Sequence, residues 1–354
     1  MNSVTLTNFR GIKSITLPLA RVTMLTGSNG TGKTSILEGL YCLFSETRLN
    51  DSPFTRYRRS IAISNPLTGT YMGYDHDANM IIRPLFWEEL PRYGKSSCSV
   101  SARYNEVLWE WNYQKANSFS DVPPELLTEI NQPNWNYNMQ SAYAIWEWKI
   151  GDGMDSKQKK AMPLAPYGVP MSQVENKSRS FCRYIDFANT RAVPAKLTFQ
   201  LSKMLAEALR LINPHVTDVR FEGADVGLSV VLNDEISVSL DNLGNGATTL
   251  ANVLIVILEK LETQTQMPDT PFFVLIDEMG AAMHLDVMMD VWKYLKALVE
   301  KHPNMYFVTT SHSSDCIRAF QEVFKDKMYI NQDNAKLLRL DKDGEEISVV
   351  ECES

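Results

Sequence analysis

Gly27-Ser-Asn-Gly-Thr-Gly-Lys-Thr34 is the stretch that decides the fold of this 354-residue chain. It has the spacing GxxxxGKT, in which a glycine-rich turn points successive backbone N–H groups at the phosphates of a nucleotide. An apolar run over residues 21–25 precedes it as a predicted strand, and residues 35–44 follow with helical periodicity. That helix would direct the positive end of its dipole at the phosphates, so the sequence predicts a nucleoside triphosphate site.

Two side chains in this loop have expected tasks of their own. Lys33 would reach the β- and γ-phosphates, and the Thr34 hydroxyl would ligate Mg²⁺. The residues expected to contact the nucleotide are Gly27, Ser28, Asn29, Gly30, Thr31, Gly32, Lys33, Thr34 and Ser35. A glycine-rich turn without a ligand is the alternative, which the flanking strand and helix make the weaker one.

The composition is that of a globular protein with no expected membrane role. Hydrophobic residues make up 44% of the chain and charged residues 22%. The five cysteines form no CxxC pair, which is typical of a reduced, cytoplasmic protein without a zinc site. The N-terminus has no signal-peptide pattern, and the apolar stretch at residues 253–258 is too short to span a bilayer.

The net charge of −7 and the pI near 5.4 argue against a surface that coats nucleic acid by bulk electrostatics. Two local basic clusters remain, at residues 56–59 and at Lys157, Lys159 and Lys160. These clusters are either solvated loops or contacts for a phosphate backbone, and the sequence does not decide between the two, so DNA is a possible partner.

The remaining pattern alternates between strands and helices. Strands are expected at 4–9, 15–19, 99–104, 106–111, 142–150, 216–221, 228–232, 236–240, 271–276, 305–309 and in two pieces over 336–350. Helices are expected at 196–211, 248–261 and 285–298. Residues 48–95 are expected to be an irregular insertion, and the proline-containing residues 151–175 a loop or hinge. The tryptophans crowded into the middle third indicate core packing, with a base-stacking platform as the alternative.

A second set of residues completes the expected site. Residues 272–276 form an apolar run typical of a buried parallel strand, and Asp277 and Glu278 follow at its end. Asp277 would hold the Mg²⁺ shell, and Glu278 would deprotonate the attacking water, as in ATPases that supply their own base. His312 ends a further apolar strand, where its imidazole could bond the γ-phosphate and the water.

These motifs resemble the ATP-binding-cassette ATPases of the SMC, RecF and OLD type, most of all their compact bacterial members labelled AAA or ATP/GTP phosphatase. The resemblance is carried by residues 8–13, the phosphate loop, residues 276–278 and residues 309–317. It implies an α/β P-loop fold with a mixed parallel core sheet, an antiparallel β subdomain and a helical lobe. Residues 1–354 would form one such module, with a variable insertion and β subdomain at 48–180 and the signature, Walker B and His-switch portion at 181–354.

The family also has a signature segment through which one subunit caps the nucleotide of the other. The matching residues are Gly244, Asn245 and Gly246, before a helix expected near Ala247. The usual serine is missing, so Asn245 and backbone amides would replace it, and a plain turn is the alternative. By the same resemblance Arg10 lies near the nucleotide base, and His284 matches the histidine after the acids.

The resemblance implies conversion of ATP and water to ADP and phosphate by a dimeric, ATP-gated switch. The expected partners are a second copy, or more, of the chain and a separate effector, a nuclease or a toxin, in anti-phage defence. The alternative is a RecF- or SMC-like repair ATPase that binds DNA. A third interpretation, a nuclease in its own right, has only His76 as a candidate residue.

Overall fold

The computed structural model describes residues 3–45, 58–59, 62–64, 71–74, 81–82, 90–104, 107–127, 142–151, 157–164, 169–170, 181–187, 198–222, 227–264, 271–281, 283–326 and 334–352. The chain divides into two compact units. Unit 1 comprises Met1–Leu19, Gly30–Ser180 and Asp341–Val349, and unit 2 comprises Ala20–Asn29, Phe181–Leu340 and Val350–Ser354. His76 and residues 56–57 of the first basic cluster lie outside the described residues.

Unit 1 is built on a six-stranded sheet in the order β11-β10-β9-β8-β1-β2, and its pairs are antiparallel. The strands are β1 (Ser3–Phe9), β2 (Ile12–Leu17), β8 (Ser97–Tyr104), β9 (Val107–Ala116), β10 (Ala142–Ile150) and β11 (Lys157–Leu164). The described part of this unit also has β4 (Arg58–Arg59), β5 (Ala62–Ser64), β6 (Tyr71–Tyr74), β7 (Ile81–Ile82), β12 (Val169–Pro170), η2 (Phe119–Asp121) and η3 (Pro124–Leu126).

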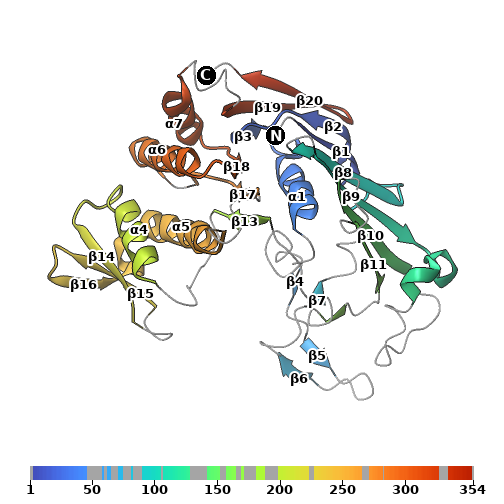
Figure 1. Ribbon diagram of the computed structural model, residues 1–354, viewed down its shortest axis with the longest axis horizontal. Helices are drawn as coiled ribbons and strands as arrows, with labels where there is room; N and C mark the ends of the chain where they lie inside the picture. Colours follow the sequence, from blue (N-terminus) through green and yellow to red (C-terminus); the bar gives the residue numbers. More distant parts are fainter. Residues whose placement is uncertain are drawn as a thin grey trace. The chain divides into compact units, whose positions relative to one another are not determined.

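Helix α1 (Lys33–Phe44) packs against one face of this sheet (Figure 1). Gly39 allows the close approach, because a Cβ there would lie 2.5 Å from a methyl carbon of Leu6. The Trp148 indole donates to the Leu43 carbonyl at 2.6 Å, and Trp109 packs between Phe44 and Trp148. The described tryptophans of this region are buried, which confirms core packing for Trp109, Trp111, Trp146 and Trp148.

The prediction of a loop or hinge at residues 151–175 is wrong for its central part, where β11 pairs with residues 142–149 of β10. The sequence of β11 contains three lysines and Pro163, which are poor strand formers. An edge strand tolerates both, because a proline needs no partner on the open side and lysines prevent further pairing. Strands β4 to β7 likewise replace part of the irregular insertion expected at 48–95.

A second six-stranded sheet has the order β13-β17-β18-β3-β19-β20, and its strands from β13 to β3 lie in unit 2. Its strands are β3 (Val22–Gly27), β13 (Cys182–Asp186), β17 (Phe272–Asp277), β18 (Met305–Thr310), β19 (Ala335–Asp343) and β20 (Glu346–Cys352). The neighbouring pairs from β13 to β19 are parallel. Every residue of β17 and β18 is buried, as expected of central strands covered on both faces.

Helices α6 (Leu285–Lys301) and α7 (Ser314–Phe324) lie side by side in this unit (Figure 1). Trp292 of α6 packs edge-on against Phe320 and Phe324 of α7 and so holds the two helices together. Helices α4 (Phe199–Leu209) and α5 (Asn245–Gln264) contribute to the same hydrophobic core. Among the described helices, none is both long and apolar enough to cross a membrane.

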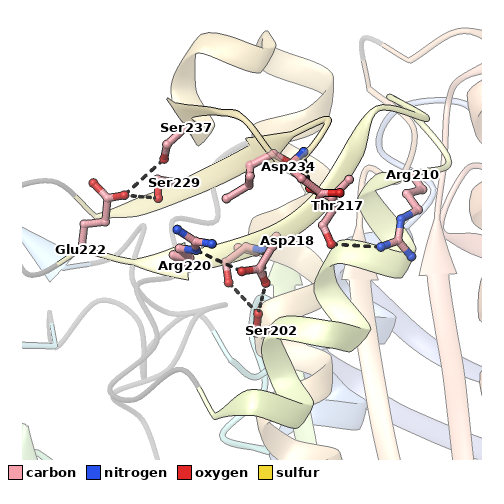
Figure 2. Close-up of polar contacts among 11 residues, drawn as sticks. Ser202, Arg210, Thr217, Asp218, Arg220, Glu222, Ser229, Asp234 and Ser237 are labelled. Carbon is pink, nitrogen blue, oxygen red and sulfur yellow. Dashed lines mark hydrogen bonds and ion pairs between the residues drawn. The ribbon is translucent and has the colours of Figure 1, made fainter.

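The helical lobe is completed by a three-stranded sheet of β14 (Val216–Phe221), β15 (Leu228–Leu232) and β16 (Ile236–Ser239). Figure 2 shows the polar contacts that tie these elements together. Asp218 on β14 accepts from Ser202 on α4 and from Arg220, both at 3.0 Å. Glu222 accepts from Ser229 and from Ser237 on β16, which leads into η6 (Leu240–Leu243). The predicted α/β fold is confirmed, with its parallel core sheet, antiparallel β subdomain and helical lobe.

Candidate nucleotide-binding site

The carboxyl edge of the parallel sheet in unit 2 brings three of the predicted segments together. Strand β18 lies between β17 and β3, so the end of β17 with its two acids and the start of the phosphate loop lie on its two sides. The Ser311 N–H, just past the end of β18, donates to the Leu25 carbonyl of β3 at 3.1 Å. In parallel sheets this edge is where ligands bind.

Backbone geometry explains the glycines of the phosphate loop. Gly27 ends β3 with φ 134°, and a Cβ there would collide with the carbonyl oxygen of Leu340 on the neighbouring β19. Gly32, with φ 92°, is the left-handed residue immediately before α1. A Cβ at Gly32 would lie 3.3 Å from side-chain carbons of Ile12 and Ile347. Glycine is therefore required at Gly27 by space and at Gly32 by conformation.

The unit 1 part of the loop presents a buried cation at a helix start. Helix α1 begins at Lys33, whose side chain is only 5% exposed and whose Nζ donates to the Thr31 hydroxyl at 3.4 Å. The first turn of α1 contains no acidic residue, so no carboxylate there reduces the positive end of the dipole. A lysine and a helix N-terminus together favour a multiply charged anion such as a triphosphate.

Arg10 forms a salt bridge with Glu38 on α1, at 2.9 Å between Nε and Oε2. Their side chains are 10% and 1% exposed, so the pair fixes the turn between β1 and β2 against the helix. Removal of either partner would leave a buried charge. The expected contact between Arg10 and the nucleotide base stays a prediction.

The two acids at the end of β17 differ in burial. Asp277 is 7% exposed and accepts hydrogen bonds from the Thr310 hydroxyl at 2.6 Å and from the Tyr184 hydroxyl at 2.7 Å. Glu278 is exposed and has φ 56°, a left-handed conformation that side chains disfavour. The buried acid suits a fixed acceptor for a metal shell, and the exposed acid suits a base that meets water.

His312 directly follows Ser311, and the His312 side chain is exposed. Ser311 is buried, and its hydroxyl donates to the Met279 carbonyl at 2.7 Å. The segment before His312 is thereby tied to the turn that follows the acids. The γ-phosphate role of His312 stays a prediction, as does any role of His284, which is exposed at the N-cap of α6.

The signature segment lies at the start of α5, which begins at Asn245 and so includes Asn245 and Gly246 in its first turn. The plain-turn alternative is therefore wrong for these two residues, and the helix starts two residues before Ala247. Gly244 has φ 89°, and a Cβ added at Gly244 or Gly246 would meet no atom within 4 Å. The segment is open for a close approach by a ligand.

A magnesium ion fits the oxygen donors that the chain provides. Mg²⁺ in nucleotide sites is held by one or two protein oxygens together with phosphates and water, and not by a cage of protein ligands. The Thr34 hydroxyl and the Asp277 carboxylate are oxygen donors of this kind. Within the described ranges, no group of three or more His, Cys, Asp or Glu side chains is placed to hold a metal ion.

Sequence reasoning missed Tyr184 and Thr310, the two hydroxyl donors to Asp277. Strand β13, which carries Tyr184, was not predicted at all. Thr310 is one of several threonines and serines before His312, with no pattern that distinguishes it. Both become visible only when the strand order places β13 and β18 on either side of β17.

Comparisons with known proteins found a family match for the first part of the chain and a structural match over its whole length. Residues 1–161 match the family model of the AAA ATPase domain. No curated protein matches the chain. Among solved structures, the SMC head domain from Thermotoga maritima is 13% identical, with a TM-score of 0.46 and coverage of 100% of this chain and 99% of that one. The match of residues 1–161 to the AAA ATPase domain agrees with the resemblance to AAA ATPases that the sequence motifs indicate.

Proposed function

We propose that the chain hydrolyses ATP and uses the ATP-bound state to close two copies of itself over two nucleotides. The observation that carries this proposal is the pair of unlike acids at the carboxyl edge of the parallel sheet. Asp277 is buried and doubly hydrogen-bonded, Glu278 is exposed, and the strand next to β17 separates them from the start of the phosphate loop.

Each residue of the proposed site then has a defined task. Lys33 and the amides at the start of α1 bind the β- and γ-phosphates and hold them in place. Thr34 and Asp277 would hold Mg²⁺, which when bound offsets phosphate charge. Glu278 accepts the proton of the attacking water, and His312 orients that water and the γ-phosphate.

The dimeric part of the proposal rests on the signature segment. A helix N-terminus preceded by a left-handed glycine presents backbone amides without an obstructing side chain, as at Gly244 and Gly246. Such a surface suits the γ-phosphate of a nucleotide held by a second copy. ATP binding would then favour the closed pair, and hydrolysis would release it.

The variant Glu278→Gln tests this mechanism. It keeps the shape and removes the base, so ATP should bind and remain, and a closed dimer or larger assembly should accumulate. Mass measured by light scattering, with and without Mg·ATP, reports this directly. A variant that stays monomeric at saturating ATP would contradict the two-copy mechanism, and hydrolysis at the parental rate would contradict the role of Glu278.

We further propose a separate effector, a nuclease or a toxin, as partner in anti-phage defence. The net charge of −7 favours this over a repair ATPase that holds DNA. The lysines of β11 lie on an edge strand, where protection against further strand pairing accounts for them. Co-purification of the Glu278→Gln protein from its native operon with ATP should recover the effector, whereas ATP-dependent retention of DNA would favour the repair role.

A further inference from the structure

The Asp277 carboxylate is held from both sides of its strand. The Thr310 hydroxyl, at the end of β18, donates to Oδ1 at 2.6 Å. The Tyr184 hydroxyl, on β13, donates to Oδ2 at 2.7 Å. Strands β13 and β18 are the two neighbours of β17, so each carboxylate oxygen receives one bond, and the two bonds come from opposite sides of the strand.

Two hydroxyl donors restrict the orientation of this carboxylate. A buried carboxylate that turns away from its donors loses hydrogen bonds at a cost in free energy. The bonds from Tyr184 and Thr310, one to each oxygen, therefore favour a single rotation of the group.

The same Thr310 hydroxyl also fixes the neighbouring acid. It accepts a hydrogen bond from the Glu278 backbone N–H at 2.9 Å while it donates to Asp277. The Thr310 carbonyl accepts from the Met279 N–H at 2.8 Å. These bonds hold the chain where Glu278 adopts its left-handed φ of 56°. One threonine therefore sets the side chain of the first acid and the backbone of the second.

We propose that Tyr184 and Thr310 are positioning residues of the ATPase reaction. Their hydroxyls orient Asp277 as an acceptor for the Mg²⁺ shell, and Thr310 also holds Glu278 in its outward turn. Neither residue is required to touch the nucleotide. This inference rests on the proposed ATPase function, and it adds two residues whose effect should appear in the metal requirement.

Strand β18 supplies a matched control for Thr310. Thr309 precedes it and is 0% exposed, and within the described residues its hydroxyl has no hydrogen-bond partner. Thr310→Val and Thr309→Val make the same change of shape at neighbouring buried positions, but only the first removes bonds to the acids. Thr310→Ser keeps the hydroxyl and should restore function. For Tyr184→Phe the control is Tyr306→Phe, at a tyrosine of β18 that stacks on Phe273.

The measurement is the Mg²⁺ concentration that gives half-maximal ATP hydrolysis, together with calorimetric titration of ATP with and without Mg²⁺. We expect Tyr184→Phe and Thr310→Val to raise the Mg²⁺ requirement about tenfold, the effect of about 1.4 kcal/mol. The affinity for metal-free ATP should not change, and the calorimetric gain from Mg²⁺ should shrink by the same factor. Thr309→Val, Tyr306→Phe and Thr310→Ser should keep the parental Mg²⁺ requirement.

The outcomes separate this inference from the proposed function. A parental Mg²⁺ requirement and a parental calorimetric gain in both Tyr184→Phe and Thr310→Val would overturn the positioning roles. Equal loss of activity in Thr309→Val and Thr310→Val would overturn them too, because it would show a packing effect. A parental protein that binds Mg·ATP without hydrolysing it would instead overturn the ATPase proposal, and the calorimetric comparison would still decide the two hydroxyls.

Discussion

Replacement of Glu278 by glycine should leave the protein more stable than replacement by alanine, and both replacements should strongly reduce hydrolysis. Glu278 has φ 56°, a left-handed conformation that costs a side-chain-bearing residue about 1–2 kcal/mol. Glycine avoids this cost, but it loses more conformational freedom on folding than alanine does, which lowers the gain in unfolding free energy by roughly 0.5–1 kcal/mol. The Glu278→Gly variant should therefore exceed Glu278→Ala in unfolding free energy by about 1 kcal/mol.

The comparison is made by urea unfolding, with Glu300 on α6 as the matched control. Glu300 is an exposed helical glutamate, where the order reverses and alanine should exceed glycine by about 1 kcal/mol. Hydrolysis should fall by about 10²–10⁴-fold in both Glu278 variants, because the base is removed. If Glu278→Ala is at least as stable as Glu278→Gly, the backbone reasoning fails. If either variant hydrolyses ATP normally, the base assignment fails.

Lys33→Ala should abolish nucleotide binding, since backbone amides cannot replace a cation at the phosphates, and unchanged Mg·ATP affinity in calorimetry would contradict the loop assignment. Gly246→Trp should impair hydrolysis while each subunit still binds ATP. In a mixture of the Gly246→Trp and Lys33→Ala proteins, a mixed dimer keeps one intact composite site, so the ATPase activity should recover in part. No recovery at any mixing ratio would count against a composite site. Gly27→Ala should lower the unfolding midpoint well below that of Gly30→Ala, because a Cβ collides with the Leu340 carbonyl in the first case and meets nothing within 4 Å in the second. Equal midpoints would show that β3 and β19 separate at little cost.

The sequence predicted well those parts of the fold that are governed by local patterns. The strand at 142–150 was predicted with its observed bounds, and the β8–β9 hairpin and the strands β14 to β18 were each predicted to within a few residues. Apolar runs and alternation carry this information because a central strand must be buried and a hairpin must turn. The phosphate loop was visible because its glycine spacing is a local motif, and at Gly32 the glycine meets a local backbone demand.

The missed elements depend on contacts between distant segments. Strand β11 is lysine-rich and contains a proline, and only its register with β10 makes it a strand. Helix α7 was missed although a local signal existed, because the Ser313 side chain caps it by accepting from the Cys316 N–H at 3.2 Å. Tyr184 and Thr310 had no local signal, since 93 and 33 residues separate them from Asp277 in the sequence.

The backbone conformation after β17 indicates a functional role for Glu278 independently of the resemblance to known motifs. Two of the three residues after Asp277 are left-handed, Glu278 with φ 56° and Gly280 with φ 81°. At Gly280 a glycine is required, because a Cβ would lie 2.7 Å from the Cβ of Cys316 on α7. At Glu278 a glycine would satisfy the same backbone demand at lower cost, yet a glutamate occupies the position, held there by the Thr310 hydroxyl. A charged side chain kept at a strained and exposed position contributes little to packing, so its carboxylate is best explained by chemistry at the edge of the sheet.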